Sequence, residues 1–275
     1  MNAATHSDEW HDWVVPDAAA VPPEPSLTTF APPDGTALRG VVLMLHGGQA
    51  NSLAPVQRRN GSWWRMALLA RAFARHAGRA GVAVELLRYS ARGWNADAGP
   101  EPAPLVDGRW ALAELSGRYR DVPLVLVGHS MGGRAACALA GEPGVTGVVA
   151  LAPWLTAEEP VEPAKGQRLV LAHGLNDRWT SPANSLDWSM RARAVSAQVA
   201  RFELPGVGHF MFSRVGEWNG IVRRGAMGLL GVEPLPTEVA EAFALTDARA
   251  ADDGGPLRQG VSTGEQGLRM PVETS

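Results

Sequence analysis

The segment Gly128-His129-Ser130-Met131-Gly132 follows directly on an apolar run, residues 124–127, and leads into small residues with helical spacing at 132–140. A strand that ends in Gly-x-Ser-x-Gly and turns at once into a helix places its serine in a strained, exposed position. The flanking glycines remove side chains that would block so tight a turn, and the helix N-terminus favours negative charge beside the serine. The pattern predicts that Ser130 is a nucleophile. A glycine-rich strand–helix joint without chemistry is the alternative.

Length and composition favour one large α/β domain. The chain has 275 residues, of which 45% are hydrophobic and 31 are glycine, so it can bury a sizeable core. Cys137 is the only cysteine, which rules out an internal disulfide and leaves a packing role. A formal net charge of -3 gives no basic footprint for nucleic acid.

The sequence also argues against a membrane partner. Residues 1–12 lack the apolar stretch of a signal peptide, and no apolar run approaches the ~20 residues that span a bilayer. We therefore expect a cytoplasmic protein with no nucleic-acid or membrane partner. The sequence carries no signal for an oligomeric state.

Hydrophobic patterning predicts alternating strands and helices. Strands are expected at residues 27–30, 40–45, 82–87, 124–127, 145–151, 168–172 and, as the last, 199–204. Helices are expected at residues 62–76, 107–119 with Asp107 as N-cap, from Ser181 with Pro182 in the first turn, and at 215–230. This order predicts a mostly parallel, doubly wound sheet with helices on both faces.

Three regions are expected along the chain. Residues 1–25 form a flexible lead-in rich in proline, residues 26–232 the α/β domain, and residues 233–275 a C-terminal extension. The extension is expected to contain a short helix at 237–250 and to be largely disordered after residue 252, where apolar periodicity ends.

The loops that follow the parallel strands meet at one edge of the sheet, where ligands bind. His46-Gly47-Gly48-Gln49 follows the first buried strand. A backbone N–H of this bend, from Gly48 or alternatively Gln49, is expected to form an oxyanion hole with the N–H of Met131. His46 is expected to hold the loop by hydrogen bonds, with a catalytic role as the alternative.

Two further strand ends supply an acid and a base. Asp177 follows the strand at 168–172, and His209 lies between glycines after the strand at 199–204. We expect Asp177 to orient His209 and His209 to act as general base for Ser130. Glu158 and Glu159 are the alternative acids. Neither a His-x-x-x-His pair nor a cysteine cluster indicates a metal site, and no cofactor is expected.

Two further motifs, Arg92-Gly93-Trp94-Asn95 and Ala152-Pro153-Trp154-Leu155, accompany the order Ser130, Asp177, His209 along the chain. With these features, the chain resembles the α/β-hydrolase superfamily over residues 26–232. Within it, these two motifs combined with His46-Gly47-Gly48 and residues 128–133 are similar to small bacterial hydrolases near the dienelactone-hydrolase and acyl-esterase branches. Dienelactone hydrolases use a cysteine nucleophile, so serine at position 130 does not imply that substrate. Nor is position 130 an aspartate, which disfavours dehalogenase or epoxide-hydrolase chemistry.

Only residues 154–167 separate two successive strands where many relatives insert a helical cap, so no large cap domain is expected. Trp94, Trp154 and Trp179 follow strand ends, where their rings are expected either to form an apolar wall for substrate or to close the core. Arg58, Arg59 and Arg92 are candidates for binding a carboxylate or phosphate, with solvated loop arginines as the alternative.

These residues predict a serine hydrolase that cleaves a small-molecule ester, thioester or lactone through an acyl-enzyme on Ser130. An acyltransferase that uses the same three residues is a second hypothesis. A binding or receptor module on the same fold is a third, disfavoured because a binder does not need all three residues.

Overall fold

A computed structural model describes residues 24–195, 197–250 and 265–272. Its centre is an eight-stranded sheet with the order β1-β3-β2-β4-β5-β6-β7-β8. The strands are β1 (Ser26–Phe30), β2 (Gly40–Leu45), β3 (Val82–Arg88), β4 (Leu124–His129), β5 (Val145–Leu151), β6 (Arg168–Gly174), β7 (Gln198–Leu204) and β8 (Met270–Pro271). Only the β1–β3 pair is antiparallel. The predicted mostly parallel sheet is confirmed.

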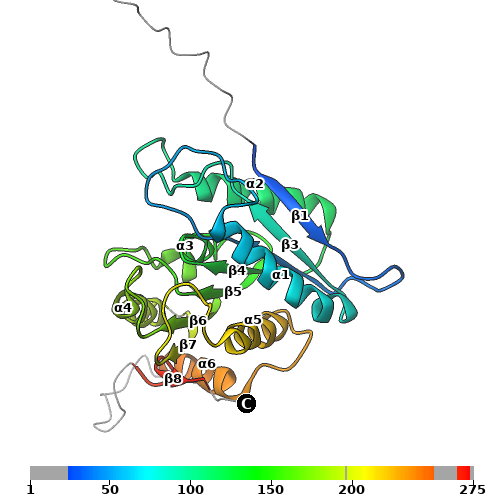
Figure 1. Ribbon diagram of the computed structural model, residues 1–275. Coiled ribbons are helices and arrows are strands. Elements are labelled where there is room, and N and C mark those ends of the chain that lie inside the picture. The colour runs from blue at the N-terminus through cyan, green and yellow to red at the C-terminus, as the bar shows by residue number, and fades with distance from the viewer. Residues whose placement is uncertain (1–23, 196, 251–264, 273–275) are drawn as a thin grey trace, which may run out of the picture.

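Helices cover both faces of this sheet (Figure 1). One face carries α1 (Gly61–Arg79), α5 (Val215–Leu229) and α6 (Thr237–Ala250), and the other carries α2 (Ala103–Arg118), α3 (Met131–Ala138) and α4 (Pro182–Ala194). Every residue of β2 and β4 is buried, as expected for strands that are covered on both faces.

The start of α4 is as predicted, and that of α2 is not. The Ser181 hydroxyl accepts the Asn184 N–H at 3.1 Å, with Pro182 as the first helical residue. By contrast, α2 begins at Ala103 after an N-cap at Pro102, so Asp107 is not its N-cap. The Asp107 carboxylate is buried and accepts hydrogen bonds from the Ser90 N–H and hydroxyl, both at 2.8 Å. It joins α2 to the loop after β3.

The segment between β5 and β6 contains only a short 3-10 helix, Glu162–Ala164. No cap domain is inserted there, as predicted. Among the described residues, no helix combines the length and apolar character needed to span a bilayer.

The C-terminal segment is part of the sheet rather than an appendage. Helix α6 packs on β7, and β8 pairs with β7 in parallel. β7 is therefore not the last strand. Residues 265–272 are described and include β8, although the chain was expected to be largely disordered after residue 252. Residues 251–264, to which the same expectation applies, lie outside the described residues. The expected lead-in lies almost wholly outside the described residues.

Two arginines hold this segment in place. Arg201 Nη1 donates to the Leu268 carbonyl at 2.9 Å, and Arg193 Nη1 donates to the Gln266 carbonyl at 2.6 Å. At the first of these anchors, the Leu268 side chain is completely buried.

Replacing Leu268 with alanine removes a fully buried side chain and leaves a cavity. We expect the free energy of unfolding to fall by about 2–5 kcal/mol, as measured by urea denaturation. Leu53→Ala is the matched control, because Leu53 is 73% exposed and its truncation is expected to change stability by less than about 0.5 kcal/mol. Equal effects of the two substitutions would show that the C-terminal segment adds nothing to the folded core.

Candidate active site

Ser130 lies at a sharp turn between β4 and α3. Its φ is 57° and its ψ is -118°, a backbone conformation that is costly for a residue with a side chain. The flanking glycines permit this turn. A Cβ on Gly128 would lie 2.1 Å from the Gly132 carbonyl oxygen, and a Cβ on Gly132 would lie 2.2 Å from that of Leu45. The backbone alone thus presents the Ser130 side chain above the sheet edge.

The structure brings together Ser130, Asp177 and His209, the three residues that were predicted from separate loops. His209 Nε2 is 2.9 Å from Ser130 Oγ, and His209 Nδ1 is 2.7 Å from Asp177 Oδ2. Because a carboxylate only accepts, Nδ1–H donates to Asp177, which leaves Nε2 to accept the Ser130 hydroxyl proton. Both Asp177 and His209 are buried, at 9% and 7% exposure. This arrangement allows proton transfer from Ser130 to His209.

The loop after β6 holds Asp177 as an ionised acceptor. Oδ1 accepts the N–H groups of Trp179 and Thr180 at 2.8 and 2.9 Å, and Oδ2 accepts the Thr180 hydroxyl at 2.8 Å. Burial alone would raise the pKa of the Asp177 carboxyl, but hydrogen bonds from His173, His209 and these backbone amides outweigh it and hold the pKa well below its usual range. Asp177 is therefore charged at neutral pH.

Three supporting residues were not singled out from the sequence. Thr180 Oγ1 lies 3.2 Å from His209 Nδ1 as well as bonding Asp177. His129 Nε2–H donates to the His209 carbonyl at 2.9 Å, and His173 Nε2 lies 3.3 Å from Asp177 Oδ2. Thr180 follows Asp177 by three residues, and a hydroxyl at this spacing is a local signal for an Asp-centred turn. The two histidine contacts, by contrast, depend on the tertiary fold.

The alternative acids lie elsewhere. Glu159 is buried in an ion pair with Arg134 at 2.8 Å and accepts the Thr156 hydroxyl. Glu158 is exposed. Among the described residues neither forms a hydrogen bond with His209.

The loop after β2 lies against the serine. A Cβ on Gly47 would lie 3.2 Å from Ser130 Cβ, and one on Gly48 would lie 2.5 Å from the Met131 side chain. The Gln49 N–H donates to the Arg92 carbonyl at 2.9 Å and is therefore occupied. Within the described residues, the N–H groups of Gly48 and Met131 have no such partner. Of the two alternatives for this loop, the geometry favours Gly48.

His46 holds this loop, as expected. Its Nε2 accepts the Tyr89 N–H at 3.3 Å, so its Nδ1–H donates to the Gly47 carbonyl at 2.7 Å. Burial lowers the pKa of His46 to about 4, which keeps the ring neutral and its two hydrogen bonds in place at neutral pH.

The three tryptophans differ in exposure. Trp179 is 72% exposed and stacks on His209 with 6.5 Å between ring centroids. Trp94 is only 4% exposed and packs edge-on against the half-buried Trp154, with the Arg134 guanidinium over both rings. Trp94 therefore closes the core, and Trp179 presents an exposed ring beside the site.

Comparison with known proteins supports this fold. Residues 42–227 match the model of a family described as the alpha/beta hydrolase family. No curated protein matches the chain.

Solved structures share the fold at low sequence identity. An alpha-beta serine hydrolase homologue from Coxiella burnetii is 16% identical, with a TM-score of 0.54 over 73% of this chain and 91% of its own. A lidless serine hydrolase from Xanthomonas campestris is 18% identical, with a TM-score of 0.52 over 74% and 89%. Esterase 2 of Thermogutta terrifontis, solved after phosphorylation by paraoxon, is 13% identical, with a TM-score of 0.58 over 77% and 91%.

Two buried histidines make the free energy of unfolding depend on pH in the acidic range. Burial lowers the pKa of His46 to about 4 and that of His129 to about 3, from 6.5. The unfolded chain therefore binds more protons than the folded chain between pH 6.5 and 4. We expect the free energy of unfolding to be fully retained above pH 6.5 and to fall on acidification by about 1.4 kcal/mol per pH unit for each histidine.

Denaturant titrations at several pH values measure this slope. His46→Gln removes one titrating group, so its slope should be shallower by about 1.4 kcal/mol per pH unit. An unchanged slope in this variant would contradict a neutral, buried His46.

Proposed function

Because this chain belongs to the alpha/beta hydrolase family, we propose that it is a serine hydrolase that cleaves a carboxylic ester, thioester or lactone through an acyl-enzyme on Ser130. The observation that carries the proposal is the continuous hydrogen-bond chain from Asp177 through His209 to Ser130. Its geometry is that of a nucleophile, a general base and an orienting carboxylate.

In the first step, Ser130 Oγ attacks the carbonyl carbon while His209 Nε2 accepts the hydroxyl proton. The charge that forms on the imidazole is stabilised by Asp177, which also fixes the tautomer with hydrogen on Nδ1. The imidazolium then donates its Nε2 proton to the departing alcohol or thiol. The contacts of His129 and Thr180 described above fix the positions of His209 and of the Asp177 carboxylate.

The negative charge on the carbonyl oxygen is received by two backbone amides, Met131 N–H and Gly48 N–H. Each donor of this kind contributes about 3 kcal/mol to transition-state stabilisation. The strained turn at Ser130 aims the first donor, and the hydrogen bonds of His46 and Gln49 hold the loop that carries the second.

Water then releases the acyl group, with His209 again as base. Ser130 is only partly buried and no cap domain is inserted after β5, which favours access of water over transfer to another acceptor. The exposed ring of Trp179 and the neighbouring Phe210, 5.3 Å apart between centroids, supply apolar surface beside His209 for an acyl or aryl group.

A fluorophosphonate probe tests the nucleophile directly. We expect one covalent adduct per chain, located on Ser130 by peptide mass spectrometry, and none in Ser130→Ala. Hydrolysis of short 4-nitrophenyl esters should fall by about 10⁴-fold or more in the same variant. Labelling or turnover that survives Ser130→Ala would contradict the assignment.

The role of Asp177 can be tested by two matched substitutions, each of which replaces a carboxylate with an amide. Asp177→Asn keeps the shape of the side chain but favours the wrong His209 tautomer, so kcat for 4-nitrophenyl esters is expected to fall by about 10⁴-fold. Glu158→Gln makes the same chemical change at an exposed alternative acid and should leave kcat unchanged. The reverse pattern would assign the acid to Glu158.

A further inference from the structure

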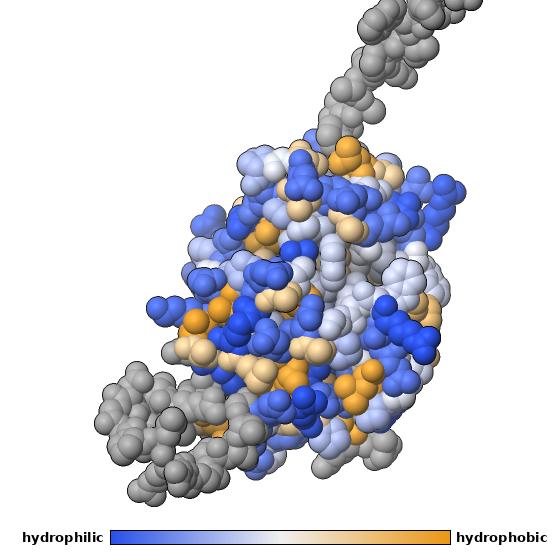
Figure 2. All heavy atoms as spheres, turned by 90° about the vertical axis from the view of Figure 1, so that its left-hand side faces the viewer, coloured by the Kyte–Doolittle hydropathy of each residue, from blue (hydrophilic) through white to orange (hydrophobic). Residues whose placement is uncertain are grey.

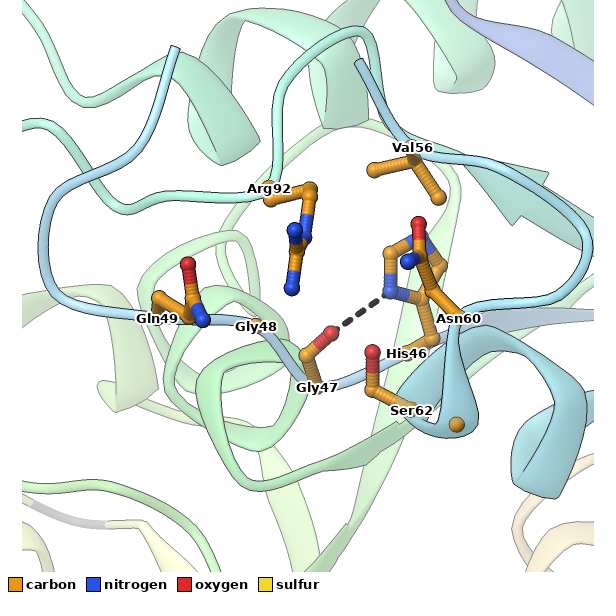
Figure 3. Close-up of a pocket in the computed structure, with 9 residues that line it drawn as sticks. His46, Gly47, Gly48, Gln49, Val56, Asn60, Ser62 and Arg92 are labelled. Atoms are coloured by element: carbon orange, nitrogen blue, oxygen red, sulfur yellow. Dashed lines mark hydrogen bonds between the residues drawn. The ribbon is translucent and has the colours of Figure 1, made fainter. Parts of the chain in front are cut away.

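A polar cavity of about 140 Å³ lies beside the loop that carries Gly47 and Gly48 (Figure 3). It is bounded by this loop, by the start of α1 and by the loop after β3, from which Arg92 projects. A cavity of this size has room for several water molecules or for an anionic group of similar bulk.

The cavity wall presents hydrogen-bond donors from several directions. The Arg92 guanidinium extends between Gln49 and Asn60, and the Ser62 hydroxyl points in from α1 (Figure 3). Asn60 Oδ1 accepts the Gln57 N–H at 2.6 Å, which leaves its NH₂ group for the cavity. Among the described residues, the side chains of Arg92, Gln49 and Ser62 form no hydrogen bond, ion pair or ring contact.

The charge of Arg92 has no counterpart in this wall. No aspartate or glutamate lines the cavity. From residue 46 to residue 84 the chain has no acidic residue but six arginines, although its net charge is -3. Figure 2 views the molecule from the left-hand side of Figure 1 and shows hydrophilic residues with scattered apolar ones between them. An anionic ligand group would balance the positive charge of Arg92 and accept hydrogen bonds from several donors at once.

The position of the cavity links it to the reaction. Gly48 borders the cavity and is the proposed oxyanion donor, while Gly47 lies next to Ser130. A group bound here would therefore lie against the loop that carries the proposed oxyanion donor. We propose that this cavity, with Arg92 as its charged anchor, binds a carboxylate of the substrate, so that the preferred substrates are anionic esters. The inference rests on the proposed ester hydrolysis at Ser130.

Matched substrate pairs measure this preference. On the acyl side, the 4-nitrophenyl ester of glutaric acid is compared with that of 5-methylhexanoic acid, in which an isopropyl group replaces the carboxylate. On the alcohol side, 4-acetoxybenzoate is compared with 4-acetoxybenzamide. After subtraction of uncatalysed hydrolysis, kcat/KM for the anionic member should exceed that of the neutral member by about tenfold or more in one pair.

Arg92→Met removes the charge but keeps much of the side-chain volume, and should lower this anionic-to-neutral ratio about tenfold or more. Ser62→Asp places a carboxylate in the cavity and should lower the ratio as well. Arg71→Met is the matched control, because Arg71 is an exposed arginine of α1 that does not line the cavity. Its ratio should equal that of the unmodified protein.

The outcomes separate this inference from the proposed function. Ser130-dependent hydrolysis with no anionic preference in either pair, or with a ratio that Arg92→Met leaves unchanged, would overturn the anion site alone. Turnover that Ser130→Ala does not affect would overturn the proposed function and the anion site with it. Because each ratio is taken within one protein sample, partial loss of folded protein does not alter it.

Discussion

The turn at Ser130 is the constraint on which the rest of the site depends. Its positive φ is tolerated only because two glycines let α3 and the loop after β2 approach within contact of the strand end. That close approach sets three things at once: the exposure of the hydroxyl, the direction of the Met131 N–H, and the position of Gly47 and Gly48 against the serine. The strained backbone of Ser130 thus organises the proposed nucleophile and its surroundings.

Around this turn, the sheet edge supplies a rigid polar network. Asp177 accepts hydrogen bonds from its own loop and from His173 and His209, and His129 donates to the backbone carbonyl of His209. Buried polar groups of this kind are stabilising only when every member has a partner. Neutral His46 and His129 and ionised Asp177 satisfy that condition, so the network that places the reactive groups also contributes to the acid sensitivity of the fold.

Local sequence signals predicted the strands and helices along the chain, the absence of a cap, the start of α4 and the loops that carry Ser130, Asp177 and His209. Each of these signals depends on residues close in the chain. The errors have a common cause in distant contacts. Asp107 bonds Ser90 rather than capping its helix, and the ordered C-terminal segment depends on Arg193 and Arg201. The sequence leaves open whether Trp94 faces the substrate or closes the core, because its burial follows from contacts with Trp154 and Arg134, which no local pattern specifies.

The proposed mechanism requires Ser130 and His209 to act as one unit in a single proton transfer. The most direct measurement is kcat for ester hydrolysis in Ser130→Ala, His209→Ala and the double variant. Removing either partner of a shared step disables it, so all three variants should retain the same low residual rate. Losses that multiply in the double variant would show that the two residues contribute independently, and would contradict the mechanism.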